Sequence, residues 1–379
     1  MTDLVRLEFD VVVLGGGPAG CATALTLNSE GVTRVLVVES SAYELPRIGE
    51  SVPPDTRQLL HQLGLLDEFL AEGHDPCVGS CSSWGSDELG YNDFIFNPFG
   101  NGWHLDRRRF DDFLARAVQK RGIELRSQTK FLDIATHAGD GVHLRLGSPT
   151  GECEVTAKFV VDATGKRSVF ARRRGARRRD LDRLISASAF FELPEQSQFA
   201  RLTFLEAVEY GWWYTARLPD RRIAVAVATS HVLYQQHRFD QQLVWLTALA
   251  QTRHIAPALV ECRFVPDSLV VCDAPSFVLD HVYGDDWLAV GDAASSYDPI
   301  SSQGIFKALA DGLSGGRAIA AYLRGNQHAL VEHQSRVERQ FSEYERQRAY
   351  YYDLERRWET APFWQDRQRR APTTASTTD

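Results

Sequence analysis

Cysteines, lysines and long apolar runs are all scarce in this chain. Six cysteines in 379 residues are too few for a disulfide framework, which favours a reducing compartment. No run approaches the roughly 18 apolar residues of a membrane span, so we expect no membrane association. The first residues lead into DVVVLGGG without a basic segment, and we expect no secretory signal and a cytoplasmic location. The net charge of −8 argues against general nucleic-acid binding.

The rest of the composition is that of a globular protein with enough apolar residues for a large core. Apolar residues make up 44% and charged residues 24% of the chain. Residues 10–39 have the pattern strand, glycine turn, helix, strand, which opens a parallel α/β sheet. Strand patterns between residues 186 and 229 are separated by Gly and Pro-Asp turns, which indicates an antiparallel sheet. Helices are expected at 56–72, 108–121, 240–252, 304–323 and 328–358.

These patterns predict a mixed α/β (α+β) fold in which a Rossmann-like nucleotide-binding domain is interrupted by a second domain. The first part of the nucleotide-binding domain is expected at 1–185, with an insertion belonging to the substrate domain at about 75–105. An antiparallel-sheet substrate domain follows at 186–275, and the first domain resumes at 276–325. A C-terminal helix and a polar, disordered tail are expected at 326–379.

A glycine-rich turn after the first predicted strand has the spacing of a dinucleotide site. Gly15 allows the tight turn, Gly17 lets a pyrophosphate approach the backbone, and Gly20 lets helix and strand pack closely. The helix N-terminus offers N–H groups and the positive end of its dipole to the phosphates. Glu39 ends the next strand and can accept hydrogen bonds from the adenosine ribose. The sequence therefore predicts that residues 10–39 bind a dinucleotide.

Further segments indicate which dinucleotide is bound. They are HLDRRRFD at 104–111, VVDATG at 160–165, WLAVGDAA at 287–294 and DPISSQG at 298–304. In this order they resemble the fingerprints of FAD-dependent flavoproteins of the aromatic-hydroxylase type. The resemblance implies that Asp292 holds the ribityl chain of FAD and that Arg107, with Arg109 as the alternative, lies beside the pyrophosphate. It also implies that the helix starting near Gln303 faces the isoalloxazine ring, where its dipole stabilises the reduced flavin.

The predicted FAD contacts are drawn from all of these segments. They are Gly15, Gly17, Pro18, Ala19, Gly20, Glu39, Ser40, Arg47, Ile48, Gly49, Arg107, Ala163, Gly165, Gly291, Asp292, Pro299, Ser302, Gln303, Gly304 and Ile305. Because only one dinucleotide fingerprint is present, we expect electrons to come from transiently bound NAD(P)H or from a separate flavin reductase.

Two other segments place the chain near the flavin-dependent tryptophan halogenases. PRIGESVPP at 46–54 resembles their flavin strap, and GWWYTARLP at 211–219 resembles their tryptophan-rich strand. Those halogenases carry a catalytic lysine in the segment that corresponds to residues 78–85, and a glutamate where this chain has Ser301. Here VGSCSSWG contains no lysine, and both groups are missing. Their loss disfavours halogenation.

The remaining chemistry is oxygen insertion. We therefore predict an FAD-dependent monooxygenase, in which a flavin C4a-hydroperoxide formed with O₂ hydroxylates an electron-rich aromatic ring. The short motifs GES at 49–51, GWW at 211–213 and SSQGIFKAL at 301–309 resemble flavoproteins that mature tryptophylquinone-containing amine and amino-acid oxidases. This resemblance implies a tryptophan or indole substrate, either free or within a precursor protein. The candidate catalytic residues are Glu50 as proton relay, Trp213 in the wall between flavin and substrate, and Ser301 and Ser302 beside the ring. No metal site is expected.

Structural alternatives exist for several of these residues. Glu50 can cap backbone N–H groups, and Trp213 can be an ordinary sheet aromatic. Residues 166–183 carry nine basic side chains, which can dock an acidic partner or a cofactor phosphate, or form a solvated helix face. Rival functions are a halogenase with an unusual catalytic group, a flavin reductase similar to the geranylgeranyl reductases, and a flavin-bearing chaperone without chemistry.

Overall fold

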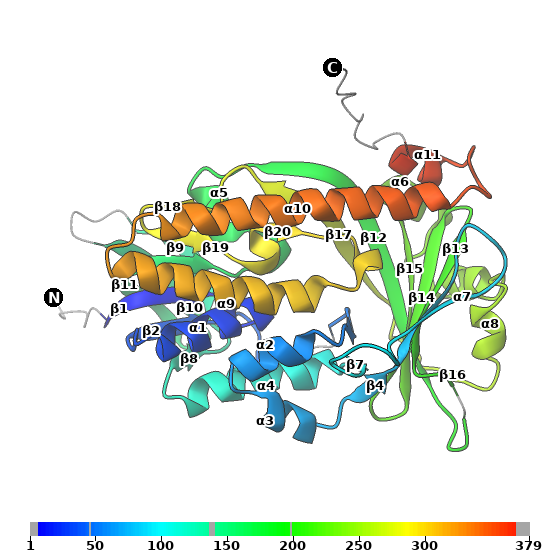
Figure 1. Cartoon of the computed structure of the whole chain (residues 1–379), viewed down its shortest axis with the longest axis horizontal. Coiled ribbons are helices and arrows are strands. Elements are labelled where there is room, and N and C mark those ends of the chain that lie inside the picture. The colour runs from blue at the N-terminus through cyan, green and yellow to red at the C-terminus, as the bar shows by residue number, and fades with distance from the viewer. Residues whose placement is uncertain (1–6, 45–46, 136–140, 198, 369–379) are drawn as a thin grey trace. The chain divides into compact units, whose positions relative to one another are not determined.

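The computed structural model describes residues 7–44, 47–135, 141–197 and 199–368 (Figure 1). Contacts divide the chain into two compact units. Unit 1 is formed by residues 1–73, 106–180 and 277–338, and unit 2 by residues 74–105, 181–276 and 339–379. The mixed α/β architecture confirms the predicted fold class. The expected polar tail and Pro46 lie outside the described residues, and no described helix has the length and apolarity to cross a membrane.

The helices in chain order are α1 Pro18–Ser29, α2 Thr56–Gln62, α3 Leu66–Ala71, α4 Arg107–Lys120, α5 Val169–Arg173, α6 His231–His237, α7 Gln242–Leu249, α8 Ile255–Ala258, α9 Gly304–Leu323, α10 Ala329–Leu354 and α11 Pro362–Gln368. Three short 3₁₀ helices are η1 Gly165–Arg167, η2 Gly291–Ala293 and η3 Pro299–Ser301. The strands are β1 Leu7–Leu14, β2 Val35–Val38, β3 Ser51–Val52, β4 Asp75–Cys77, β5 Gly79–Ser83, β6 Gly90–Asp93, β7 Gly102–His104, β8 Glu124–Arg126, β9 Lys130–Ile134, β10 Val142–Ser148, β11 Gly151–Asp162, β12 Arg178–Glu192, β13 Leu202–Val208, β14 Gly211–Leu218, β15 Arg222–Ser230, β16 Arg263–Phe264, β17 Val270–Leu279, β18 Tyr283–Gly284, β19 Trp287–Ala289 and β20 Ser295–Ser296.

The sheet of unit 1 is built around β1. It pairs in parallel with β2 and β11, and β11 pairs in parallel with β19. Register brings the strand ends level, because Leu14 lies opposite both Val38 and Asp162, and Asp162 lies opposite Ala289. The loops that follow these four strands therefore leave the sheet at the same edge, where ligands of open α/β sheets bind.

Helices α1 and α9 pack closely against each other in unit 1. A Cβ on Gly312 would lie 2.4 Å from the Ala19 carbonyl oxygen, and one on Gly316 would lie 2.7 Å from the Thr26 Cβ. These glycines therefore let the two helix backbones approach more closely than side chains would allow. The packing fixes the N-terminal halves of both helices, which carry two of the predicted FAD motifs.

Unit 2 contains a sheet in the order β12-β15-β14-β13-β5-β6. Its pairs are antiparallel except for β13 and β5, which run parallel. One face packs on α7 and α8 through a core that includes Trp213, Val225 and Trp245. Because side chains alternate along a strand, Trp212 and Tyr214 project from the opposite face.

Two expectations about helices were wrong. The single helix expected at 56–72 is broken into α2 and α3 at Gly64, whose φ of +66° ends the first helix. The basic segment 166–183 is not one helix face, because α5 ends at Arg173 and β12 begins at Arg178. Ion pairs neutralise part of the segment: Arg174 lies 2.6 Å from Asp286, and Arg173 pairs with Asp133.

Candidate functional site

The three glycines of the turn after β1 occupy different environments. Gly15 has a φ of +112°, and a Cβ there would lie 2.2 Å from the Ala163 carbonyl oxygen. A Cβ on Gly20 would lie 1.8 Å from the Gly15 carbonyl oxygen. Gly17 has an extended backbone that any residue adopts, and the nearest atom to a Cβ there is an Arg47 nitrogen at 3.9 Å. Gly15 and Gly20 are thus required by the fold, whereas the space beside Gly17 is open to a ligand.

The carboxylate of Glu39 holds the glycine turn in place. It is buried at the end of β2, and its Oε2 accepts the Gly16 N–H at 2.8 Å. Its Oε1 accepts the Ser41 N–H at 2.8 Å and the Ser41 hydroxyl at 2.7 Å, with the Ser40 hydroxyl at 3.4 Å. Oε1 therefore has three donors, whereas Oε2 has one among the described residues, and its second lone pair can accept a ribose hydroxyl. Glu39 therefore combines a structural role with the predicted ribose contact.

Arg47 and Tyr43 complete this side of the turn. The Tyr43 hydroxyl donates to the Gly16 carbonyl at 2.9 Å, and burial raises its pKa, which keeps the phenol protonated. Arg47 Nη1 lies 2.9 Å from the Asp111 carboxylate, and its Nη2 lies 3.5 Å from Glu39. Arg47 is a third exposed and borders the space beside Gly17, where a positive charge suits a pyrophosphate.

Arg107 ties the strap to α4. Its Nη1 donates to the carbonyls of Ile48 at 3.0 Å and Gly49 at 3.3 Å. Its Nε and Nη2 each lie 3.2 Å from the Asp111 carboxylate. Arg109, the alternative pyrophosphate contact, instead donates to the Glu72 carbonyl. Between the two arginines, Arg107 is the one that contacts predicted FAD residues.

The charges around Arg107 connect the strap with the turn after β19. Burial lowers the pKa of Arg107, but the carboxylates of Asp111, Glu50 and Asp292 outweigh that effect and hold the pKa above its usual value. Glu50 itself is buried, with 2% of its surface exposed. Arg107 therefore stays charged, and the carboxylates of Glu50 and Asp292 both contribute to the electrostatic environment that keeps it so.

The segment after β11 is fixed by a buried carboxylate. Asp162 accepts the Thr164 N–H at 2.9 Å, the Thr164 hydroxyl at 2.6 Å and the Ala171 N–H at 2.8 Å. Burial raises its pKa despite these donors. Ala163 donates its N–H to the Leu14 carbonyl at 2.8 Å, and Gly165 turns with a φ of +66°. Ala163 is thus placed beside the glycine turn, and Gly165 follows two residues later.

The turn after β19 approaches the N-terminus of α1. Gly291 has a φ of +60°, and a Cβ on it would lie 2.6 Å from the Cβ of Ala19. Lys307 of α9 is buried and donates to the Gly291 carbonyl and to Asp311, each at 2.9 Å. Sequence reasoning missed this anchor, although a Lys–Asp pair four residues apart on one helix is a recognisable signal. Asp292 is half-buried in η2 and therefore remains accessible.

The loop before α9 is rigid and ends in an exposed helix N-terminus. The buried Asp298 accepts the Ile300 N–H at 3.0 Å, and the Ser301 hydroxyl donates to the Asp298 carbonyl at 2.9 Å. Ser302 adopts a φ of +50°, which directs the chain into α9. Gln303 and Gly304 are exposed at the helix start, whereas Ile305 is buried. The N–H groups of Ile300, Ser301, Ser302 and Gln303 are used within the loop, so it is the start of α9 at Gly304 that can offer helix N–H groups at the surface of unit 1.

These features of unit 1 fit FAD. The open space beside Gly17 and the N-terminus of α1 suit a pyrophosphate, and Glu39 suits the ribose. Asp292 suits the ribityl hydroxyls, and the exposed start of α9 suits the pyrimidine edge of the ring. The predicted contacts on the four parallel strand ends and on α9 therefore form one coherent set within unit 1.

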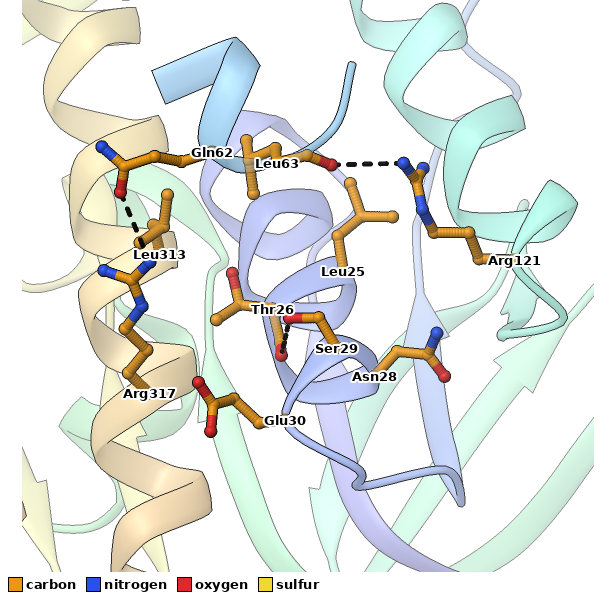
Figure 2. A pocket seen from close by; sticks show the side chains of 10 residues that line it. All are labelled: Leu25, Thr26, Asn28, Ser29, Glu30, Gln62, Leu63, Arg121, Leu313 and Arg317. Atoms are coloured by element: carbon orange, nitrogen blue, oxygen red, sulfur yellow. Dashed lines mark hydrogen bonds between the residues drawn. The ribbon is translucent and has the colours of Figure 1, made fainter. Parts of the chain in front are cut away.

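A shallow pocket in unit 1 is separate from that set (Figure 2). It lies at the C-terminal end of α1, on the order of 12 Å along the helix from Gly17. Two arginines line it, and both already have partners: Arg317 donates to the Gln62 side chain at 3.3 Å, and Arg121 donates to the Leu63 carbonyl at 3.2 Å. We therefore assign it no role in nucleotide binding.

The tryptophans of β14 divide between two faces of the unit 2 sheet. Trp213 is fully buried, its ring lies 5.1 Å from that of Trp245, and its indole N–H donates to the Tyr210 hydroxyl at 3.2 Å. This environment is the ordinary packing that was the alternative to its predicted catalytic role. Trp212 projects from the other face and donates its indole N–H to the Tyr352 hydroxyl at 3.1 Å. Trp212 is also buried, with 2% of its surface exposed, so only its position on the other face of the sheet distinguishes it from Trp213 as a candidate for a substrate wall.

Comparisons with known proteins show the family of this chain. The sequence matches the family described as an FAD binding domain over residues 8–343. It is 32% identical over 363 residues to the putative FAD-dependent oxidoreductase LodB of Marinomonas mediterranea, covering 95% of this chain and 97% of that protein. It is 28% identical over 334 residues to the 1H-pyrrole-2-carbonyl-(peptidyl-carrier protein) brominase of Pseudoalteromonas luteoviolacea, covering 84% and 79%.

The solved structures similar to this chain include a halogenase and a tryptophan dihydroxylase. The myxobacterial chondrochloren halogenase CndH matches with a TM-score of 0.86 at 25% identity, over 96% of this chain and 86% of that chain. The peptidyl tryptophan dihydroxylase QhpG, described as essential for tryptophylquinone cofactor biogenesis, matches with a TM-score of 0.71 at 26% identity, over 95% and 79%.

Proposed function

The chain belongs to the FAD-binding-domain family and is an FAD-dependent oxidoreductase, and from this premise we propose that it is a monooxygenase of electron-rich aromatic rings. The proposed ring is the indole of a tryptophan within a precursor polypeptide of a quinone-cofactor oxidase. The likeness to QhpG, whose description names a peptidyl tryptophan, supports this substrate class. Electrons are proposed to come from NAD(P)H or from a separate flavin reductase.

The observation that carries the proposal is the accessible edge of the unit 1 sheet. Gly17 leaves room for a pyrophosphate, Asp292 remains accessible, and α9 starts at the surface with Gln303 exposed. When bound, FAD supplies the redox chemistry with O₂ that no protein side chain provides. One oxygen atom then enters the ring and the other leaves as water, with two electrons from the donor.

The residues of this chain bind the cofactor and move protons. The N-terminus of α1 and Arg47 bind the pyrophosphate, Glu39 binds the ribose, and Asp292 binds the ribityl chain. Arg107 holds the strap through the Ile48 and Gly49 carbonyls, so that Glu50 is kept in a fixed position. We assign Glu50 the proton transfer that accompanies hydroxylation, because it is a buried carboxyl directly after Ile48 and Gly49, whose carbonyls Arg107 holds.

Halogenation is the second candidate, because several relatives other than LodB are halogenases or brominases. The lysine that the resemblance places in the segment 78–85 is missing from this sequence, and so is a glutamate at Ser301. A halogenase would therefore need a different activating group. Bromide-dependent products would favour this alternative.

The experiment is product analysis with the reconstituted enzyme. Purified protein is incubated with FAD, NADH, a flavin reductase, O₂ and either free indole, tryptophan or a tryptophan-containing peptide, with and without bromide. We expect hydroxylated product that forms equally well without bromide. Glu50→Gln should retain FAD but lose most of the product, whereas Glu44→Gln, at an exposed glutamate six residues earlier in the chain, should behave as wild type. Reduced flavin that oxidises without any aromatic product would contradict the proposal.

A further inference from the structure

The β5–β6 hairpin of unit 2 exposes a sheet edge beside apolar side chains. β6 is the last strand of its sheet, and no strand pairs with its outer side among the described residues. All four of its residues are exposed. Just beyond it, Ile95 is 78% and Phe96 94% exposed, and Tyr91 within the strand is 63% exposed. Exposed edges and apolar patches of this kind usually mark interaction sites.

The register of the hairpin shows which backbone groups face outward. Phe94 donates its N–H to the Val78 carbonyl at 2.9 Å, and Asn92 lies opposite Ser80. Because hydrogen-bonded pairs alternate in an antiparallel ladder, Asn92 also points its N–H and C=O toward β5. Tyr91 and Asp93 therefore point theirs away from the sheet. A partner strand can bond to both residues without disturbing β5.

The edge has only part of the protection that natural edge strands carry. The strand β6 is short and ends in the charged Asp93, but Gly90–Asp93 contains no lysine, proline or bulge. The segment 85–101 contains Asp87, Glu88 and Asp93 but no basic residue. Glu88 and Asp93 are exposed, so the complementary partner is basic where it flanks the edge.

We propose that β6 and the apolar side chains of Ile95 and Phe96 dock an extended, basic-flanked segment of the polypeptide substrate by strand addition. The nature of this partner rests on the proposed function. Backbone hydrogen bonds to Tyr91 and Asp93 hold the segment, and its apolar residues cover Ile95 and Phe96. Recognition through the backbone lets a polypeptide bind with little demand on its sequence.

The test uses a fluorescent nine-residue peptide with one tryptophan, alternating β-branched residues and an arginine at each end. In two further versions, every second backbone nitrogen carries an N-methyl group. The methyl groups of one version block one edge of the extended peptide, and those of the other version block the opposite edge. Fluorescence anisotropy with the FAD-loaded protein should show binding that one methylated version retains and the other loses. Equal binding of all three peptides, or binding of none, would overturn the proposal.

Variants then locate the site. The double substitution I95S/F96S should weaken binding at least about tenfold, the loss expected from two apolar contacts. D93P, which removes an outward N–H, should weaken binding more than D93A, which removes only the charge. FAD content and NADH-driven O₂ consumption should stay unchanged in all three, so a failure to oxygenate the peptide remains separate from a failure to dock it. If these substitutions instead dissociate a dimer in sedimentation while peptide affinity is unchanged, the edge pairs two copies of the chain and the proposal is wrong.

Discussion

Replacing Gly17 with alanine separates nucleotide binding from folding in the glycine turn. Gly17 has φ −77° and ψ −172°, a conformation open to alanine, and the added Cβ would have only Arg47 within 4 Å. Gly20→Ala is the matched control, because its Cβ would lie 1.8 Å from the Gly15 carbonyl oxygen. The two variants therefore add the same methyl group to open space and to a closely packed backbone.

The expected changes in stability differ between the two variants in the protein without FAD. Alanine at Gly17 should change stability by less than about 1 kcal/mol, because the entropy lost by the unfolded chain offsets the poorer N-cap of α1. Alanine at Gly20 should lower stability by about 1–3 kcal/mol, because overpacking outweighs the better helix propensity. In G17A the methyl group occupies the pyrophosphate position, and FAD affinity should fall about 10- to 100-fold, or about 1.4–2.7 kcal/mol.

Urea unfolding of the FAD-free proteins and titration with FAD, followed by flavin fluorescence, measure both quantities. G17A should lose FAD affinity while its stability stays within about 1 kcal/mol of the wild type. Wild-type FAD affinity in G17A would refute the assignment of the pyrophosphate to this turn. So would a loss of stability in G17A as large as that in G20A.

Three further predictions concern buried groups. Lys307→Met should destabilise the protein by about 3–5 kcal/mol, because it leaves the buried Asp311 carboxylate unpaired. Adding Asp311→Leu should restore stability but not FAD affinity, because Lys307 also anchors the Gly291 carbonyl. Burial lowers the pKa of His104 to about 4, so only the unfolded state takes up a proton as the pH falls from 6.5 to 4. The free energy of unfolding should therefore fall by on the order of 3 kcal/mol over this range, and His104→Gln should flatten that part of the curve measured by urea unfolding. Trp213→Leu should lower the melting temperature without changing kcat/KM of the folded enzyme, whereas Trp212→Leu should lower kcat/KM for the aromatic substrate. If Trp213→Leu alone impaired turnover, Trp213 rather than Trp212 would line the substrate.

Local patterns were sufficient to predict the nucleotide-binding unit. The glycine spacing, the acid at the end of β2 and the helix at 304–323 are encoded in short segments, and α9 has the bounds expected from its apolar spacing. The antiparallel sheet was also predicted from strand and turn signals. Parallel pairing of β1, β11 and β19 joins residues far apart in the chain, and only the resemblance of their motifs indicated it.

Other features depend on contacts that a pattern does not contain. The orientation of Trp213 and Trp212 follows from the strand register, which a WW pair leaves ambiguous. Apolar spacing extended the helix across Gly64, because the periodicity continues past the residue that breaks it. The choice between Arg107 and Arg109 needed the positions of the strap carbonyls and of Glu72.

The most direct test of the central claim is the origin of the oxygen in the product. A tryptophan-containing peptide is turned over by the FAD-loaded enzyme under isotopically labelled O₂, and the product is sequenced by mass spectrometry. The account predicts labelled oxygen on the indole ring, formed without halide. A product that carries bromine, an unlabelled product or turnover that continues without O₂ would contradict it.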